Sequence, residues 1–341
     1  SVEIYFYKKT TNQPQIPLNT NNYISTTMHY ATGTILTPNQ LTPGYIAYDN
    51  TGIHDIQFNT TPPSTTISGI LVPTFINSHT HLGDAFIYSQ KHQIPHNIKE
   101  AVAPPNGLKH QLLETTPKQT IQTGINKALK YMKEHHTQWF CDFREGGLPG
   151  IQLLKQPLHT TNLNNIILAR PKNNTYNPSE IQQLLTHADG IGLSSISDWD
   201  YSLVQKIAQT THTKNKIFAL HASEAHRENI DLILDLKPHL LIHMTQATKN
   251  DLTRVANEQI PIVICPRSNH YFNITPPYKL YKETHTTLLL GTDNAMLTPP
   301  NILKEMQFLQ HHTTQFTQEE LLTMITYTPR KALNLDDHIP G

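Results

Sequence analysis

From Leu71 onward the chain alternates short apolar segments with stretches of helical apolar period, and this alternation constrains the fold most strongly. Strands separated by helices predict a parallel sheet, and eight of them favour an α/β fold of the closed (β/α)8 TIM-like barrel type. A doubly wound open sheet is the alternative, but no glycine-rich phosphate loop follows any segment. The expected strands are 71–77, 138–143, 165–169, 190–193, 217–220, 240–244, 260–265 and 286–290.

Helix start signals precede three of the intervening stretches. Residues 116–119 and 177–180 each combine a capping residue, a first-turn proline and a Gln or Glu three positions after the cap. Residues 317–320 offer a similar cap before Leu321. Apolar residues then recur at helical spacing, so each helix is expected to bury one face against the strands.

Residues 1–70 have a different texture, with abundant Thr, Asn and Pro and short β-like pieces at 2–7, 33–36, 45–48 and 53–58. We expect a small β-rich accessory domain over 1–70, either a β-sandwich or a partial sheet. The barrel domain is expected over 71–341.

Composition narrows the possible partners. Lys+Arg and Asp+Glu balance at 26 each among 341 residues, so no net field favours nucleic acid or an anionic membrane. Cys141 and Cys265 lie in apolar segments, which indicates buried free thiols and fits a reducing cytosol. No apolar run has membrane-spanning length and the N-terminus has no signal-peptide core. We therefore expect a cytoplasmic protein with a small-molecule substrate, and a homodimer if it forms oligomers.

Two histidines end the first expected strand, in His79-Thr80-His81. Side chains two residues apart on an extended segment point to the same face, so both imidazoles project together. Such a pair suits a divalent cation of borderline softness such as zinc. Because the chain has 21 histidines, a chance pair at the surface is the alternative.

Polar side chains also follow other strands, and in a barrel all these strand ends meet at one rim. They are Arg144 and Glu145 after the second strand, His221 and Glu224 after the fifth, His243 in the sixth, Arg267, Ser268 and Asn269 after the seventh, and Asp293 after the eighth. The segment 85–114 is longer than a structural link requires, so we expect it to line the mouth of the barrel.

Taken in chain order, these motifs resemble the sequence motifs of the metal-dependent amidohydrolase superfamily. The resemblance is strongest to its cytosine deaminase, guanine deaminase and chlorohydrolase branch. The motifs are His79-Thr80-His81, His221-Ala222-Ser223-Glu224, His243, Cys265-Pro266-Arg267-Ser268-Asn269 and Gly291-Thr292-Asp293. The resemblance covers about residues 70–335 and implies a metal-dependent barrel that hydrolyses carbon–nitrogen or related bonds of small molecules. Family members continue beyond the region of 336–341 into strands of the small domain, so either that domain is incomplete here or the natural chain continues past Gly341.

The resemblance also implies residue roles. His79, His81, His221 and Asp293 would hold one divalent metal, with zinc expected and iron the alternative. Glu224 would carry the proton from water to the leaving nitrogen, and Asp293 would accept a hydrogen bond from the nucleophile. His243 would polarise the attacked carbon's substituent or stabilise the oxyanion. The candidate substrate contacts are Arg144, Glu145, Arg267, Ser268 and Asn269.

Each role has a structural alternative. Asp293 could cap a helix, Glu224 could be a solvated first-turn glutamate of a helix over 226–235, and His243 could be a core histidine. Residues 267–269 could be turn formers, and Arg144 with Glu145 could be an internal ion pair next to a flexible turn. The fourth strand has no lysine to bridge two metals, although Lys172 or Glu145 could do so.

The predicted function is hydrolysis of non-peptide carbon–nitrogen bonds, specifically deamination of a heterocyclic amine by metal-activated water. Two alternatives remain at this point. One is a catalytically silent barrel that binds a ligand, and the other is a metal-dependent ester or phosphoester hydrolase.

Overall fold

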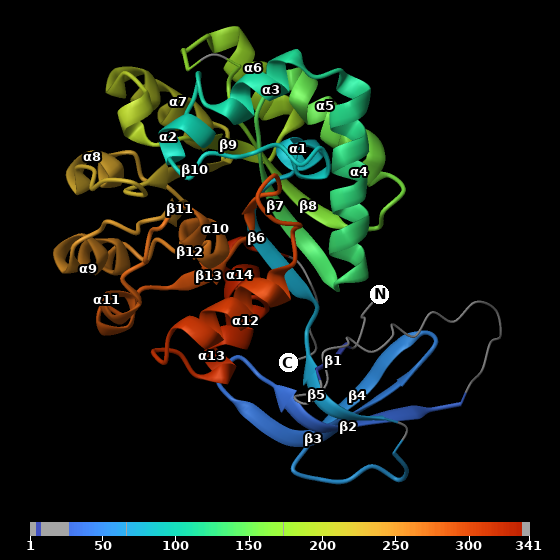
Figure 1. Cartoon of the computed structure of the whole chain (residues 1–341). Coiled ribbons are helices and arrows are strands. Elements are labelled where there is room, and N and C mark those ends of the chain that lie inside the picture. The colour runs from blue at the N-terminus through green and yellow to red at the C-terminus, as the bar shows by residue number, and fades with distance from the viewer. Residues whose placement is uncertain (1–4, 8–26, 66, 173, 336–341) are drawn as a thin grey trace. The chain divides into compact units, whose positions relative to one another are not determined.

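The computed structural model describes residues 5–7, 27–65, 67–172 and 174–335 (Figure 1). The chain divides into two compact units, one formed by residues up to Ile76 together with those from Thr317, and the other by Asn77–Phe316. The sequence-based division was at residue 70, with all of 71–341 in the barrel. Hydrogen bonds from Tyr327 Oη to the Leu36 carbonyl and from Arg330 to the Thr74 carbonyl tie the C-terminal segment to the first unit.

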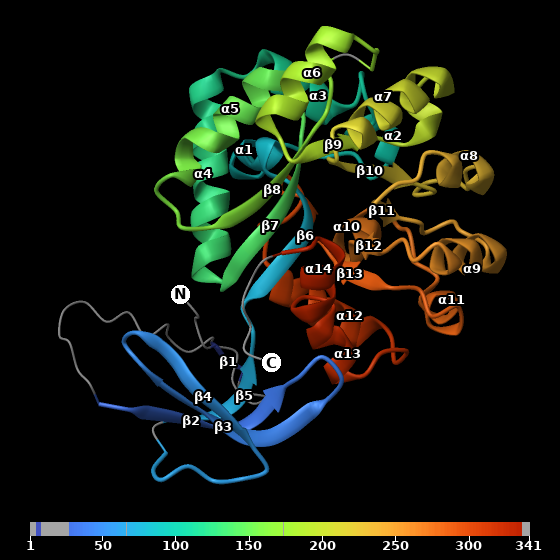
Figure 2. The ribbon, with the colours of Figure 1, turned by 180° about the vertical axis from the view of Figure 1, so that it is seen from behind.

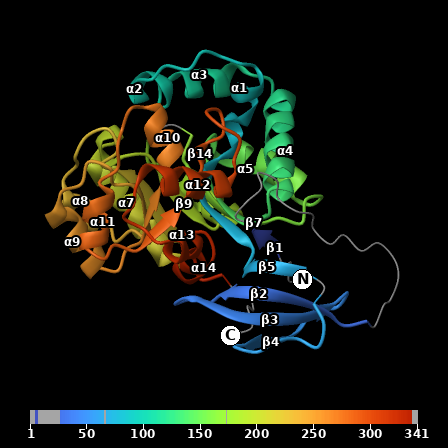
Figure 3. The ribbon, with the colours of Figure 1, turned by 60° about the horizontal axis from the view of Figure 1, so that its bottom comes forward.

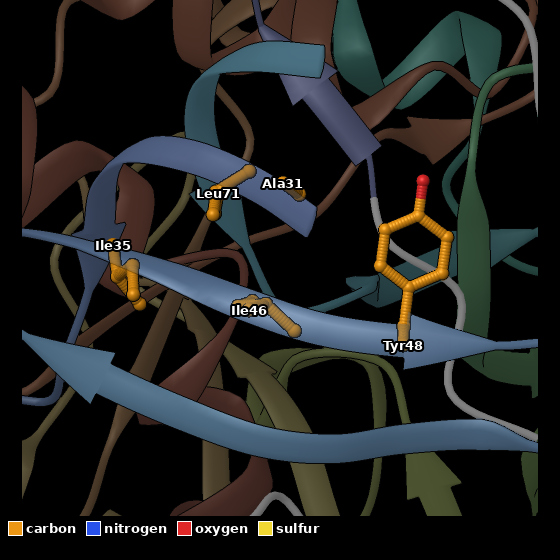
Figure 4. Close-up of a cluster of buried hydrophobic side chains, with 5 residues drawn as sticks. All are labelled: Ala31, Ile35, Ile46, Tyr48 and Leu71. Carbon is orange, nitrogen blue, oxygen red and sulfur yellow. The ribbon is translucent and has the colours of Figure 1, made fainter. Parts of the chain in front are cut away.

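The first unit contains one five-stranded sheet in the order β1-β5-β2-β3-β4. Its strands are β1 (Tyr5–Tyr7), β2 (His29–Leu36), β3 (Leu41–Asp49), β4 (Gly52–Phe58) and β5 (Ile67–Val72). Buried Ala31, Ile35, Ile46, Tyr48 and Leu71 form its apolar cluster (Figure 4). The pieces expected at 33–36, 45–48 and 53–58 lie in β2, β3 and β4, while residues 2–4 are outside the described part of the chain.

The strand expected at 71–77 has the wrong bounds. Leu71 and Val72 end β5 in the small sheet, and the first barrel strand is β6 (Phe75–His81). Pro73 lies between the two strands, and proline has no N–H to donate to a sheet ladder. An apolar run alone did not reveal this break.

The second sheet is the barrel, in which strands that follow one another along the chain are neighbours. After β6 these are β7 (Thr137–Arg144), β8 (Asn164–Ala169), β9 (Gly190–Leu193), β10 (Ile217–Ala222), β11 (Leu240–His243), β12 (Ile262–Ile264) and β13 (Leu288–Leu290). The chain then enters β14 (Asp293–Asn294), which pairs in parallel with Thr80 and His81 of β6 and so closes the ring. The predicted (β/α)8 barrel is confirmed.

Closure brings β13 and β14 close to the first strand at Gly291. A Cβ on Gly291 would lie 2.6 Å from the Cβ of His79 and 2.9 Å from its backbone. Glycine therefore permits the approach that lets Thr292 N donate to the His79 carbonyl at 2.9 Å. This contact places the end of the last strand beside the paired histidines.

Helices lie outside the ring of strands, as Figure 1 and Figure 2 show for α4 to α9. Their buried faces carry the expected apolar residues, such as Ile121, Ile125 and Leu129 on α4. From residue 118 onward the described helices of the barrel unit are α4 (Lys118–Glu134), α5 (Gly147–Leu158), α6 (Pro178–His187), α7 (Tyr201–Thr213), α8 (Ile230–Asp235), α9 (Lys249–Asn257), α10 (Pro266–Tyr271), α11 (Tyr278–Glu283) and α12 (Ile302–His312). In the described part of the chain no helix is both long and apolar enough to cross a bilayer.

Two of the three predicted caps are present. The Asn177 side chain accepts from the first turn of α6, and Thr317 forms a capping box with Glu320 at α13 (Gln318–Thr323). The structure also describes α14 (Tyr327–Ala332) in the first unit. The third cap was wrong, because Thr116 ends the preceding helix and α4 begins after Pro117 with no side-chain cap from the described residues.

The long segment after β6 is largely helical. It contains α1 (Ala85–Ser89), α2 (Ile98–Ala101) and α3 (Leu108–Thr115), preceded by the 3₁₀ turn Leu82–Asp84. Figure 3 shows α1, α2 and α3 side by side along one edge of the barrel unit. A cavity in the barrel unit is lined by the strand ends together with residues of this segment, namely Ile98, Lys99, Val102, Ala103, Pro104 and Lys109.

Candidate metal centre

Buried polar side chains from four barrel strands converge at one point. Ligand atoms of His79, His221, His243 and Asp293 all lie within 4.8 Å of one another. His81 joins them, because its Nε2 is 3.3 Å from His221 Nε2 and 3.5 Å from Asp293 Oδ1. The closed ring thus brings residues 79 and 293, at opposite ends of the barrel sequence, into contact.

Backbone carbonyls determine which nitrogens of two of these rings carry hydrogen. His221 Nδ1 is 2.8 Å from the Leu193 carbonyl oxygen, and His81 Nδ1 is 3.1 Å from the Phe143 carbonyl oxygen. A carbonyl oxygen can only accept, so both Nδ1 atoms donate, and each neutral ring then has a lone pair on Nε2. Burial lowers the pKa of His81 to about 3 and also lowers that of His221, which keeps both rings neutral.

Two nitrogen lone pairs therefore face each other across 3.3 Å. Asp293 Oδ1 lies beside them without a hydrogen bond, and neither ring nitrogen of His79 has a hydrogen-bond partner among the described residues. Burial favours a protonated Asp293, but the contact with His79 and the surrounding imidazoles outweigh it and hold its pKa well below the usual range. Such an electron-rich, buried cluster has the donor atoms that a divalent cation such as zinc prefers.

The spacing of the cluster fits a tetrahedral cation site. Ligand bonds of about 2.1 Å in a tetrahedron separate neighbouring ligand atoms by about 3.4 Å. The observed separations are 3.3 Å from His79 Nε2 to Asp293 Oδ1, 3.5 Å from His81 to the same oxygen, and 3.3 Å between His81 and His221. His243 Nε2 lies farther out, 4.0 Å from Asp293 Oδ2.

A carboxyl group stands next to His243 on the cavity side. Glu224 Oε1 is 3.3 Å from His243 Nε2, and Asn269 Nδ2 donates to the same oxygen at 3.5 Å. Burial raises the pKa of Glu224 to about 7. The alternative of a solvated first-turn glutamate was wrong, because α8 begins only at Ile230, with Asn229 as its cap.

A second carboxylate supports His81 from behind. Glu145 Oε1 accepts from His81 Nδ1 and from Lys109 Nζ, both at 2.7 Å, and Oε2 accepts from Arg144 at 3.0 Å. Burial alone would raise the pKa of Glu145, but Lys109 and His81 hold it well below its usual range. A carboxylate behind a ligating histidine orients the ring and makes it a stronger ligand.

A cavity of about 370 Å³ opens over the cluster. Its described lining includes His81, His221, Glu224, His243 and Asp293 from the predicted site. The lining does not include the five candidate substrate contacts, Arg144, Glu145, Arg267, Ser268 and Asn269. Their role as substrate contacts stays a prediction.

Those five side chains instead contact other groups of the barrel. Ser268 Oγ donates to Asp293 Oδ2, and Asn269 Nδ2 is 3.3 Å from His243 Nδ1. Arg267 Nη1 is 3.3 Å from the buried Glu305. Ser268 and Asn269 therefore help to orient Asp293 and His243 by hydrogen bonding.

Polar lining residues that the sequence analysis missed include Lys109, Arg170, Ser194 and Asp198. Arg170 directly follows β8, so the rule that found the other strand-end residues could have found it. Lys109 comes from α3, and nothing in its sequence context singles it out.

The sequence matches the model of the amidohydrolase family over residues 70–339. The chain belongs to that family. An uncharacterized protein of Methanocaldococcus jannaschii is 34% identical over 290 residues, which cover 79% of this chain and 74% of that protein.

Solved structures share the fold of this amidohydrolase. Helicobacter pylori aminofutalosine deaminase in complex with methylthio-coformycin has a TM-score of 0.69 at 13% identity, covering 91% of this chain and 88% of that one. An adenosine deaminase from Xanthomonas campestris with bound zinc has a TM-score of 0.68 at 13% identity, covering 92% and 81%. With family membership established, this amidohydrolase is a metal-dependent hydrolase that acts on carbon–nitrogen bonds of a small molecule.

Proposed function

We propose that this amidohydrolase deaminates a heterocyclic amine, with a single zinc ion held by His79, His81, His221 and Asp293. The observation that carries the proposal is the pair of facing Nε2 lone pairs on His81 and His221 beside the unbonded Asp293 Oδ1. The fold relatives that are deaminases, one of them with bound zinc, support the choice of reaction and metal.

The ligand set favours catalysis over a purely structural site. Three imidazoles and one carboxylate leave room for a water molecule, and zinc at such a site lowers the pKa of that water toward neutrality. Lys172, the lysine considered as a bridge, does not line the cavity in the described part of the chain, which supports one metal.

Glu224 is the proposed proton carrier. Its carboxyl group lines the cavity, and a pKa near 7 allows it to accept a proton from water and return it to the leaving nitrogen at neutral pH. Its contact with His243 Nε2 at 3.3 Å limits the orientations that the carboxyl group can adopt.

His243 is the proposed hydrogen-bonding partner of the substrate. It lines the cavity, it is 1% exposed, and its backbone has a φ of 75° at the end of β11. A non-glycine residue in this left-handed region is strained, and such strain is concentrated at functional sites. Asn269 and Glu224 contact its two ring nitrogens and fix the ring over the cavity.

The experiment is a metal analysis coupled to an ammonia-release screen. Purified protein is loaded with zinc and incubated with purines, pyrimidines and other heterocyclic amines, with amides and phosphoesters as comparison substrates. We expect about one zinc per chain and ammonia release from at least one heterocyclic amine. In Glu224→Gln the zinc should remain and ammonia release should fall by a factor of about 100 to 10,000.

Zinc-loaded, folded protein that releases phosphate or nothing at all would refute the deaminase proposal. Protein that binds two zinc ions per chain would refute the single-metal part alone. The two parts of the proposal are therefore tested separately.

A further inference from the structure

Arg170 is a buried cation that faces the cavity, and the described part of the chain supplies no ion-pair partner for it. It is 5% exposed, it lines the cavity, and its Nε has no hydrogen bond. The guanidinium group stays charged in proteins and has five N–H donors. A buried charge without a partner is costly, so a site that retains one is expected to supply the partner from outside the chain.

The described carboxylates near Arg170 form no ion pair with it. The charge of Glu145 attracts it, but Glu145 is bonded to Lys109 and Arg144 instead. Asp198 also lines the cavity and attracts Arg170, but its own hydrogen-bond partner is the Ser194 side chain. The donors of Arg170 thus remain available to a molecule in the cavity.

The charge of the lining favours an anion. Lys99, Lys109 and Arg170 are balanced by three carboxylates, those of Asp198, Glu224 and Asp293. A bound divalent cation makes the sum positive. Because positive potential in a low-dielectric cleft concentrates anions, an acidic ligand is favoured over a neutral one.

Arg170 is also close enough to the metal centre for one small molecule to reach both. Arg170, His221 and Asp293 all line this one cavity. A cavity of about 370 Å³ is within the range of pockets that hold a compact small molecule.

We propose that Arg170 binds an oxyanion of the substrate, so that the amine hydrolysed here carries a carboxylate or phosphate group. The inference rests on the proposed function, because it assumes that the cavity holds the amine. The guanidinium fork matches either oxyanion in a bidentate contact, which also orients the amine-bearing carbon toward Glu224.

The test measures binding and does not require turnover. Zinc-loaded Glu224→Gln protein, with Arg170 intact or replaced by Gln or Lys, is titrated calorimetrically with matched pairs of compounds. Adenosine and adenosine 5′-monophosphate test a phosphate, and 4-aminopyrimidine and 4-aminopyrimidine-5-carboxylate test a carboxylate. Arg254→Gln is the control, since it removes one positive charge from a pair of exposed residues.

With Arg170 intact, we expect at least one acidic compound to bind at least about tenfold more tightly than its neutral partner. Arg170→Gln should abolish the difference and leave the neutral partner unaffected. Arg170→Lys should retain part of the difference in affinity between the acidic compound and its neutral partner. Arg254→Gln should retain all of this difference. The pair that shows the difference identifies the oxyanion.

Three results overturn the proposal. The first is equal binding of acidic and neutral compounds, or no binding of either acidic compound at millimolar concentration, when Arg170 is intact. The second is a preference for the acidic compound that survives Arg170→Gln, which would assign the oxyanion to the metal. The third is that Arg170→Gln weakens the binding of the acidic and the neutral member of a pair equally. Thermal unfolding of each variant shows whether it is folded, and failure of ammonia release alone would leave the binding result standing.

Discussion

The assignment of His81 as a metal ligand and His243 as a substrate contact gives a sharp prediction. The group of ligand atoms that all lie within 4.8 Å of one another includes His243 and not His81, whereas the separations near 3.4 Å select His81. Replacing each histidine by Asn distinguishes the two sets. The Asn amide in His81→Asn can still donate to the Phe143 carbonyl, so the substitution removes mainly Nε2.

The size of the effect follows from the number of ligands. Zinc sites bind with an apparent free energy of about 12 kcal/mol, so each of four ligands contributes on the order of 3 kcal/mol. We therefore expect His81→Asn to weaken zinc binding by more than about a hundredfold. His243→Asn should keep its zinc and lose most of its turnover.

The assay is competition for zinc against a chelating dye, together with metal content after dialysis. His311→Asn is the control, because His311 is an exposed histidine on α12 and should retain both zinc and turnover. Loss of zinc from His243→Asn with full retention in His81→Asn would refute the reasoning and exchange the two roles.

Three further predictions concern pH and stability. Because Glu224 must begin deprotonated, kcat/KM should fall as pH drops below about 7, and Glu224→Gln should lack this limb of the pH profile. Tyr281→Phe removes the hydroxyl that donates to the His243 carbonyl at 2.9 Å, so urea unfolding should show a loss of about 1 kcal/mol, and an unchanged stability would contradict this. Burial alone would raise the pKa of Asp251, but hydrogen bonds led by that of Arg227 lower it to about 2. The free energy of unfolding of the wild type should therefore exceed that of Asp251→Asn by about 2 kcal/mol above pH 4, and this difference should disappear as the pH falls toward 2. A difference in urea unfolding that persists in acid would rule out this linkage.

Much of the barrel could be predicted because its strands are short, apolar and separated by capped helices. The segments 138–143, 165–169 and 190–193 coincide with β7, β8 and β9 to within one residue at each end. The first strand could not be placed in this way, since 71–77 is apolar on both sides of Pro73. Only pairing showed that its first residues belong to another sheet.

Candidate site residues at strand ends could be grouped in advance for a physical reason. The carboxyl ends of parallel barrel strands meet at one rim whatever their separation along the chain. His79 and Asp293 are adjacent for this reason, and the same rule includes Arg170 after β8. Lys109 could not be found, because it reaches the cavity from a long helical segment whose path depends on packing.

Sequence alone determined the closed barrel and the convergence of the histidines and Asp293, because periodicity and strand order are written into local residue patterns. Tertiary structure alone decided which ring nitrogens face one another, since the carbonyls of Phe143 and Leu193 that hold His81 and His221 come from neighbouring strands. It also decided that Glu145 supports His81 while Arg170 stays free toward the cavity. Such choices depend on distances between residues far apart in the chain, which no local pattern encodes.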